Sequence, residues 1–146
     1  MKTHALPVAN LPIDAVFAST GLRVGVDIVQ ISAITDSITA FGHHFMHRIF
    51  CAGEIEYALA APRLTAQRLA ARFAAKEAAF KAFGLSEAGI SWRDIEVRKS
   101  PDGGCTLVLH RLAAQIAQAS GCTEIALSLS HDGDYATAMV AAVAPR

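Results

Sequence analysis

The chain has 146 residues, of which 53% are hydrophobic and 18% charged, and this length suffices for one domain with a buried core. Thirteen Lys and Arg residues balance thirteen Asp and Glu residues, so no overall field favours nucleic acid or an anionic membrane surface. No apolar run approaches the roughly 20 residues of a membrane-spanning helix, and the N-terminus does not resemble a signal peptide. We therefore expect a soluble protein.

The cysteines indicate the compartment. Cys51, Cys105 and Cys122 are odd in number and show no spacing typical of a zinc site or a disulfide framework. Free thiols of this kind are ordinary in a reducing cytoplasm, where we expect the protein to reside.

The first predicted element is a strand over residues 22–29. Its nearly continuous β-branched run is typical of a strand that is buried on both faces. Residues 1–21 precede it, and Pro7 and Pro12 interrupt them. We expect these residues to form an extended N-terminal arm, followed by a single domain over 22–146.

The remaining elements alternate between helices and strands. The longest is a helix over 63–83, which Gly84 ends at a position where glycine is common. Asp132-Gly133 is a strong hairpin signal near the C-terminus. The pattern predicts an α+β fold in which a mostly antiparallel sheet packs against one long helix. The other predicted helices cover 32–40, 43–50, 54–61 and 112–119, and the other strands lie within 90–99, 105–110, 124–130 and 135–143.

The long helix carries charge where an amphipathic helix is normally apolar. At roughly 100° per residue, Leu69 and the three phenylalanines of this helix share one stripe, and Lys76 falls within it. Glu77 lies at the edge of the stripe, beside Lys81 one turn later. Burial of an ammonium or a carboxylate is unfavourable without a partner, so these groups are either tightly paired or used in function.

Asp27 and Glu77 are candidate ligands of a metal ion. Asp27 is the single carboxylate of the first strand and, by strand alternation, shares a face with Gly25, which would leave space beside it. Two half-buried carboxylates repel each other unless a cation lies between them, and two carboxylates with water and substrate phosphates commonly hold Mg²⁺. Taken singly, Asp27 is more simply a helix cap and Glu77 a partner of Lys76 or Lys81. Taken together, they favour a Mg²⁺ site.

Basic residues in the same region suggest a ligand that carries phosphate. Arg72, Lys76 and Lys81 occupy three successive turns of the long helix, and Arg48 lies on a preceding short helix. Since the net charge is zero, this local positive charge would suit phosphate groups beside a metal ion.

Other polar side chains give weaker evidence for a role in binding or catalysis. Arg68 and Lys99 are expected to extend into solvent, as long side chains usually do. His131 could donate to a phosphate, although a histidine at a turn is more often simply exposed. Ser130 has no acid–base partner in the sequence that would make it a nucleophile, so triad chemistry is not expected.

Five segments form a combined pattern along the chain. They are GVDIVQI (25–31), HRIF (47–50), RLAARFAAKEAAFKAFG (68–84), WRDIEV (92–97) and LSLSHDGDYATAMVAA (127–142). In this order they resemble the holo-acyl-carrier-protein synthases, the small bacterial-type members of the 4'-phosphopantetheinyl transferase superfamily. The resemblance extends from about residue 22 to residue 143.

The resemblance implies a fold and a reaction. Members transfer 4'-phosphopantetheine from coenzyme A to a serine of an apo-acyl carrier protein and release adenosine 3',5'-bisphosphate. The motifs match Asp27 and Glu77 to the ligands of Mg²⁺, which binds together with the pyrophosphate of coenzyme A. They match Lys81 to a lysine near that pyrophosphate. No residue is an obvious base for the serine proton, which a metal-held water oriented by Asp27 or Glu77 could accept.

The resemblance also implies a nucleotide site and an assembly. It matches Arg48, Arg72 and His131 to basic positions that line the nucleotide site, with Ser130 beside His131. Members are typically homotrimers in which adjacent subunits share each active site. We therefore expect the segment over 128–131 to serve the site of a neighbouring subunit, and we expect no nucleic-acid or membrane partner.

Two departures from the family pattern leave alternatives open. Members commonly continue the first strand with a glutamate and then an arginine, where this chain has Gln30 and Ala33, and its N-terminal arm is longer. Both favour a specialised carrier, such as one from a secondary-metabolite pathway, beside the fatty-acid carrier. The alternatives are a non-catalytic homologue that binds coenzyme A or a carrier, and a metal-dependent hydrolase of phosphoanhydrides.

Overall fold

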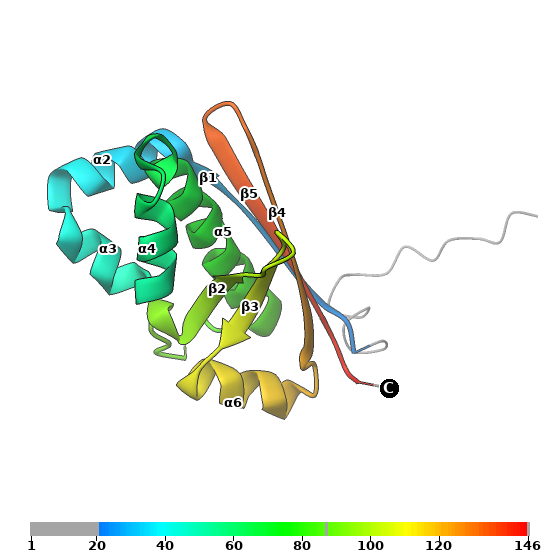
Figure 1. The fold of residues 1–146 in the computed structure, drawn as a ribbon. Helices are drawn as coiled ribbons and strands as arrows, with labels where there is room; N and C mark the ends of the chain where they lie inside the picture. The colour runs from blue at the N-terminus through cyan, green and yellow to red at the C-terminus, as the bar shows by residue number, and fades with distance from the viewer. Residues whose placement is uncertain (1–20, 87, 146) are drawn as a thin grey trace, which may run out of the picture.

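One long helix, α5 (Thr65–Phe83), runs along one face of the larger sheet (Figure 1). The structure is a computed structural model that describes residues 21–86 and 88–145, so the predicted N-terminal arm lies outside it apart from Gly21. The helix ends as predicted, because Gly84 adopts a left-handed φ of 65° and its N–H donates to the Phe80 carbonyl.

The strands form two antiparallel sheets. The larger has the order β1 (Arg23–Gln30), β5 (Tyr135–Val143), β4 (Glu124–Asp132), so β1 and β4 are its outer strands. The smaller pairs β2 (Ile95–Lys99) with β3 (Cys105–Leu109). The predicted α+β class is confirmed, although the sheet is divided in two.

The remaining helices surround α5. Three of them lie on the side of α5 away from the larger sheet, and α6 lies beside the smaller sheet (Figure 1). This arrangement covers α5 on most sides, which accounts for the burial of its Ala, Phe and Leu side chains. Their bounds are α2 (Ile31–Phe41), α3 (His43–Ile49), α4 (Ala52–Leu59) and α6 (Arg111–Ser120), with short 3-10 turns η1 (Pro62–Leu64) and η2 (Trp92–Asp94).

The expectation that the first strand is buried on both faces is wrong. In β1, Gly25 is buried against α5, whereas Val26 and Ile28 are 58% and 65% exposed. The physical reason is that a helix layer covers only one face of this antiparallel sheet. A β-branched run does not distinguish a strand covered on one face from a strand covered on both. The apolar outer face of β1 is therefore open on the single chain.

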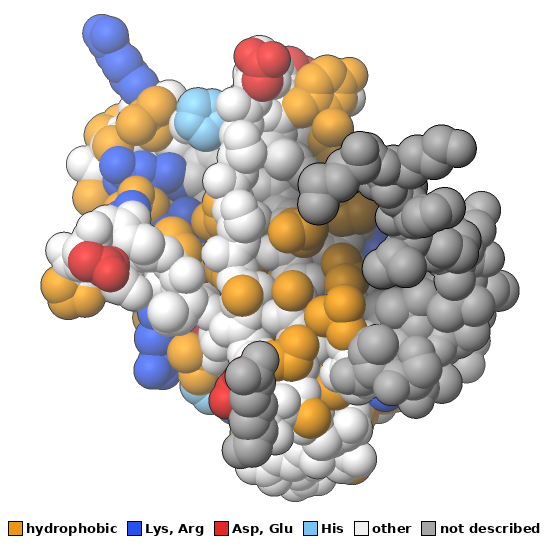
Figure 2. All heavy atoms as spheres, turned by 90° about the vertical axis from the view of Figure 1, so that its right-hand side faces the viewer, with side chains coloured by type: hydrophobic (Ala, Val, Ile, Leu, Met, Phe, Trp, Pro, Cys, Tyr) orange, Lys and Arg blue, Asp and Glu red, His pale blue; other side chains and the backbone are white. Residues whose placement is uncertain are grey.

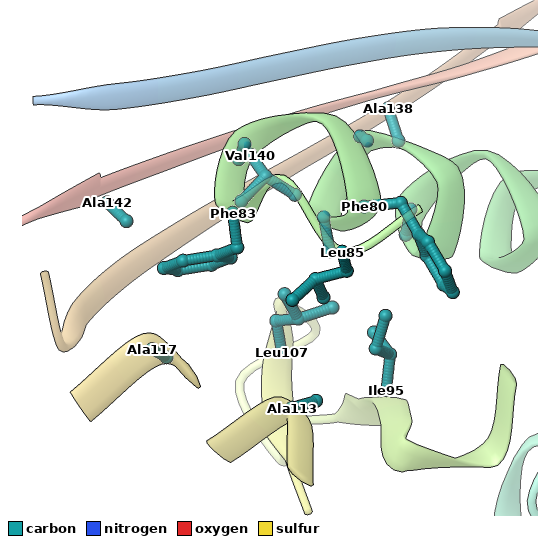
Figure 3. Close-up of a cluster of buried hydrophobic side chains, with 14 of the residues drawn as sticks. Phe80, Phe83, Leu85, Ile95, Leu107, Ala113, Ala117, Ala138, Val140 and Ala142 are labelled. Carbon is teal, nitrogen blue, oxygen red and sulfur yellow. The ribbon is translucent and has the colours of Figure 1, made fainter. Parts of the chain in front are cut away.

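The main core lies between the two sheets, with the C-terminal end of α5 at its centre (Figure 3). Phe80, Phe83 and Leu85 are at most 9% exposed. Burial of a side chain of this size stabilises the fold by about 1.5–3 kcal/mol. The side chains around them are Ala138, Val140 and Ala142 of β5, Ile95 of β2, Leu107 of β3, and Ala113 and Ala117 of α6.

Within the described residues, no helix is long and apolar enough to cross a membrane.

Candidate functional site

A close contact between β1 and α5 brings Asp27 and Glu77 together. A Cβ added to Gly25 would lie 1.9 Å from the Ala78 carbonyl oxygen, so only glycine lets the helix approach the strand this closely. The prediction that Gly25 leaves space beside the Asp27 carboxylate therefore needs correction, because helix backbone fills that space. Gly25 instead places the strand carboxylate beside the helix residues that follow Lys76.

Lys81 is the cation of this acidic pair. Its Nζ donates to Asp27 Oδ1 at 2.9 Å and to the Val26 carbonyl oxygen at 2.9 Å. The Lys81 side chain is 54% exposed and the Asp27 side chain 17%. An ammonium has three N–H donors, so Lys81 retains one for a ligand that approaches from solvent.

Glu77 is half-buried on the same side of α5. Burial raises the pKa of its carboxyl above the usual range, the negative charge of Asp27 raises it further, and Lys81 partly opposes both effects. The predicted electrostatic conflict between the two carboxylates is thus present in the fold. Two oxygen ligands whose repulsion a cation would relieve fit Mg²⁺, with its other positions left to water and phosphate oxygens.

Lys76 belongs to a different environment although it adjoins Glu77 in sequence. It forms an ion pair of 2.8 Å with Glu54 of α4, and both side chains are fully buried. Its Nζ also donates to the carbonyl oxygens of Trp92 and Ile95. Lys76 is therefore tightly paired within its own chain, and neither a partner subunit nor solvent is needed to satisfy it.

Glu54 is equally well satisfied, and the sequence analysis missed it. Its two carboxylate oxygens accept from Lys76, from the Cys51 N–H at 2.9 Å and from the Val97 N–H at 3.2 Å. The network joins α4, α5, η2 and β2 at one buried point. The available signal was a lysine on an apolar stripe, which requires a buried acid, but the sequence does not say which one.

A second site is a cavity of about 470 Å³ between α4, the first half of α5, the β2–β3 turn and β4. Arg72, Ser130 and His131 line it, as the predicted nucleotide site requires, and Arg68 and Lys99 add positive charge. The described residues that line it include no Asp or Glu. We call this cavity the anion pocket.

Arg72 is the least solvated cation of the anion pocket. It is 3% exposed, its Nε has no hydrogen-bond partner among the described residues, and burial lowers the pKa of its guanidinium. A buried N–H donor without an acceptor is costly, so it favours a ligand that supplies an oxygen.

One expectation about cations needs correction. Arg68 was expected to extend into solvent, yet it is half-buried and lines the anion pocket. Lys99 is exposed as expected, and it also lines the pocket. The missed signal was the i, i+4 spacing of Arg68 and Arg72, which places both on one side of α5. Glu77 is about 140° further round the helix from Arg72 at roughly 100° per residue, so the acidic pair and the anion pocket occupy different sides.

The fold of the single chain brings Arg48 neither to the acidic pair nor to the anion pocket. It is exposed on α3 and lines a separate, mainly apolar groove of about 310 Å³ together with Phe41, Phe45 and Trp92. Its match to the nucleotide site therefore stays a prediction.

Asp27 is not the cap of the helix that follows β1. The Ser32 N–H and Ser32 Oγ donate to the two carboxylate oxygens of Asp134, at 2.9 and 2.6 Å, and these bonds lower the pKa of Asp134. The β4–β5 hairpin thus holds the start of α2, where Gln30 is exposed. The single-residue explanation of Asp27 as a cap is wrong, and its carboxylate remains available beside Glu77.

Known proteins of one family match most of the chain. The family model of the 4'-phosphopantetheinyl transferase superfamily matches residues 23–140. The chain belongs to this superfamily, on its holo-acyl-carrier-protein synthase branch. The predictions of that family, of its fold and of a phosphopantetheinyl transferase enzyme are confirmed.

Individual relatives cover most of the chain. The holo-[acyl-carrier-protein] synthase of Koribacter versatilis is 45% identical over 120 residues, which are 82% of this chain and 95% of the relative. The ACPS–CoA complex of Chronobacterium ammoniagenes has a TM-score of 0.74 and 33% identity, covering 86% of this chain and 98% of its own. The Bacillus anthracis holo-(acyl-carrier-protein) synthase in complex with CoA (3',5'-ADP) has a TM-score of 0.67 and 31% identity, with coverages of 84% and 96%.

Proposed function

We propose that this protein transfers 4'-phosphopantetheine from coenzyme A to a serine of an apo-acyl carrier protein and releases adenosine 3',5'-bisphosphate. The observation that carries the proposal is the convergence of Asp27, Glu77 and Lys81 on one side of α5, in a chain of this family. The names of the relatives, several of which are complexes with coenzyme A, support the choice of substrate.

The reaction is Mg²⁺-dependent, and Asp27 and Glu77 are the residues that would hold the ion. When bound, Mg²⁺ neutralises the pyrophosphate charge and stabilises the leaving phosphate. The raised pKa of Glu77 supports this role, since the fold holds two carboxylates close together without a full counter-charge from protein. The described residues offer no group of three or more His, Cys, Asp or Glu ligands, so oxygens from substrate and water complete the set.

The side chains around the acidic pair supply orientation and proton transfer. Lys81 keeps one N–H donor that points to no described acceptor, and it binds a pyrophosphate oxygen beside Asp27. The carrier serine is a weak nucleophile until its proton is removed. A water molecule oriented by Asp27 or Glu77 accepts that proton.

The anion pocket binds the nucleotide end of coenzyme A. Its lack of lining carboxylates and its buried Arg72 suit phosphate groups, and Ser130 and His131 lie at its rim. These contacts provide binding energy at a distance from the reacting phosphorus, which helps to hold the substrate in place.

The active site is shared between subunits of a homotrimer. In the register of the larger sheet Asp27 pairs with Ala138 and Ala138 with Leu129, whereas Ser130 pairs with Thr137. Directly paired residues share a face, and successive residues alternate, so Asp27 and Ser130 point to opposite faces of the sheet. The side chain of Ser130 is thus available to a neighbouring subunit that packs on the outer face of the sheet, whereas His131 shares the face of Asp27.

An apolar surface supports the assembly. On the outer face of the larger sheet, hydrophobic side chains gather over the middle of the molecule (Figure 2). Apolar surface of this kind commonly marks a protein interface. The exposed residues are Val26 and Ile28 of β1 with Tyr135, Met139 and Val143 of β5.

The carrier docks by charge, because acyl carrier proteins are acidic. Arg48 at the edge of the apolar groove on α3 provides a positive group for that contact. The three free cysteines, Cys51, Cys105 and Cys122, support a cytoplasmic location. A single domain over residues 22–146 is proposed as well, and the predicted arm over 1–21 lies outside the described residues apart from Gly21.

A mass-shift assay tests the proposal. The protein is incubated with coenzyme A, Mg²⁺ and a panel of fatty-acid and secondary-metabolite apo-carriers, and each carrier is then weighed. A gain of one phosphopantetheine on a carrier, lost with EDTA and restored by Mg²⁺, is expected. A folded protein that modifies no carrier would contradict the proposal. Nucleotide release without a carrier would instead support the alternative of a metal-dependent phosphoanhydride hydrolase.

The trimer has its own test. Sedimentation equilibrium should give three times the chain mass for the wild type and a lower mass for Ile28→Asp, whose new charge lies in the apolar face. Transfer should fall with the loss of assembly. A fully active monomer would contradict the shared site.

A further inference from the structure

Three cationic side chains of the anion pocket converge on one aromatic ring, that of Tyr57 on α4. The guanidinium carbons of Arg68 and Arg72 lie 4.0 and 4.3 Å from the ring centroid, and Lys99 Nζ lies 5.7 Å from it. Each distance falls within the roughly 6 Å over which a cation is attracted to the face of a ring. All four side chains line the pocket.

These cations are not neutralised by carboxylates. Among the ion pairs of the described residues none involves Arg68, Arg72 or Lys99. Their hydrogen bonds go to neutral carbonyl oxygens: Arg68 Nη1 to Tyr57 at 2.6 Å, Arg72 Nη1 to Arg68 at 3.2 Å, and Lys99 Nζ to Gly103 at 2.7 Å. The pocket therefore keeps its positive charge in the absence of a ligand.

Like charges held this close normally separate or recruit an acid. The quadrupole of a tyrosine ring attracts both guanidinium groups at once, yet it carries no net charge of its own. The ring thus opposes the repulsion between the two arginines without cancelling the charge that would attract an anion. Arg72 adds an independent sign of an expected ligand, because its buried Nε lacks a protein acceptor.

We infer that Tyr57 is a positioning residue of the anion pocket, which holds Arg68 and Arg72 against one ring so that both guanidinium groups meet the phosphate of a bound nucleotide. Arg68 becomes a phosphate-binding residue by the same argument. That the nucleotide belongs to coenzyme A rests on the proposed function. The role of the ring in anion binding rests on the contacts around Tyr57.

Calorimetric titration with adenosine 3',5'-bisphosphate tests the inference on the full chain. Tyr57→Leu should weaken binding about 10-fold, whereas Tyr57→Phe, which keeps the ring, should stay within about 2-fold of the wild type. In the transfer assay, Tyr57→Leu should raise the KM for coenzyme A and leave kcat nearly unchanged, because the pocket and the acidic pair occupy different sides of α5. Leu59→Ala, an exposed change on the same helix, is the matched control and should alter neither value.

A second variant does not depend on the folding of Tyr57→Leu. Arg68→Lys keeps the charge but removes the planar group that stacks on the ring, and it should weaken bisphosphate binding several-fold. Equal affinity of the wild type, Arg68→Lys and a folded Tyr57→Leu would overturn the inference. So would an equal loss in Tyr57→Phe and Tyr57→Leu, since the hydroxyl and not the ring would then be responsible.

The titration also separates this inference from the proposed function, because it needs neither carrier nor transfer. Ring-dependent binding of the bisphosphate by a protein that modifies no carrier would refute the function and support the role of Tyr57. Normal transfer to a carrier, with bisphosphate binding that does not depend on the ring, would support the function and refute the role of Tyr57.

Discussion

Two lysines of α5 each pair with a carboxylate of another element, at nearly equal distance and with very different burial. Lys76 and Glu54 are 2.8 Å apart, and Lys81 and Asp27 are 2.9 Å apart. The first pair is fully buried, whereas the side chains of the second are 54% and 17% exposed. Only five positions along one helix separate the two lysines.

The difference shows how one helix can serve the core and the site at once. All donors of Lys76 are used inside the protein, by Glu54 and by two backbone carbonyl oxygens. Lys81 retains a donor, and its partner Asp27 lies beside Glu77, whose pKa is raised. A satisfied buried pair fixes structure, while an exposed and incompletely neutralised pair can bind a ligand.

We call Lys76–Glu54 the closed pair, and Lys81–Asp27 with the adjacent Glu77 the open pair. The largest expected effect is on the closed pair. Lys76→Met leaves the Glu54 carboxylate buried without its cation and should lower the free energy of unfolding by about 3–5 kcal/mol, measured by urea denaturation. Adding Glu54→Gln should recover part of the loss, because the amide oxygen can still accept from backbone N–H groups while the buried charge is gone. Lys81→Met, the matched change in the open pair, should cost less than about 1 kcal/mol. Equal losses in the two lysine variants would break the comparison.

The next effect is on the open pair, and it should appear in the rate. Asp27→Asn and Glu77→Gln should each lower kcat for carrier modification by about 10²–10³-fold, the usual result of removing one preorganised electrostatic group. The midpoint of thermal unfolding should stay near that of the wild type, and Glu56→Gln on the exposed side of α4 should change neither. Near-full activity in either site variant would remove that residue from the metal site.

A smaller effect should come from the contact that brings the open pair together. Gly25→Ala introduces a Cβ 1.9 Å from the Ala78 carbonyl oxygen, so the strand and the helix must move apart. We expect a loss of about 1–3 kcal/mol in unfolding free energy together with reduced activity. Gly53→Ala, where the added Cβ meets nothing within 4 Å, is the control. Wild-type stability in Gly25→Ala would contradict the close approach.

The smallest effect is a pH dependence in the open pair. The folded-state pKa of Glu77 is raised, so protonation of Glu77 favours the folded state. This contribution is fully present below the unfolded-state pKa of a glutamate and is lost as pH rises through the raised folded-state value. As pH rises from the acidic range towards neutral, thermal unfolding midpoints measured without Mg²⁺ should therefore fall more for the wild type than for Glu77→Gln. Parallel profiles would show that neither burial nor the charge of Asp27 raises the pKa of Glu77 in the folded state.

Local signals determined much of the fold in advance. The end of α5 at Gly84 follows from glycine's left-handed backbone, and the β4–β5 hairpin follows from Asp132-Gly133. The stripe position of Lys76 indicated a lysine that is either tightly paired or used in function, and the structure shows tight pairing with Glu54. These predictions succeeded because helix period and turn chemistry depend on residues that are near in sequence.

The sequence alone also determined the acidic pair of the candidate site. Asp27 and Glu77 stood out as carboxylates on otherwise apolar elements, and tertiary packing does bring them together. The tertiary structure decided the partners: Glu54 for Lys76, Asp134 for Ser32, and Tyr57 for the two arginines. Each of these contacts joins separate elements of the chain, and periodicity can say that a charge needs a partner without saying which one the fold delivers.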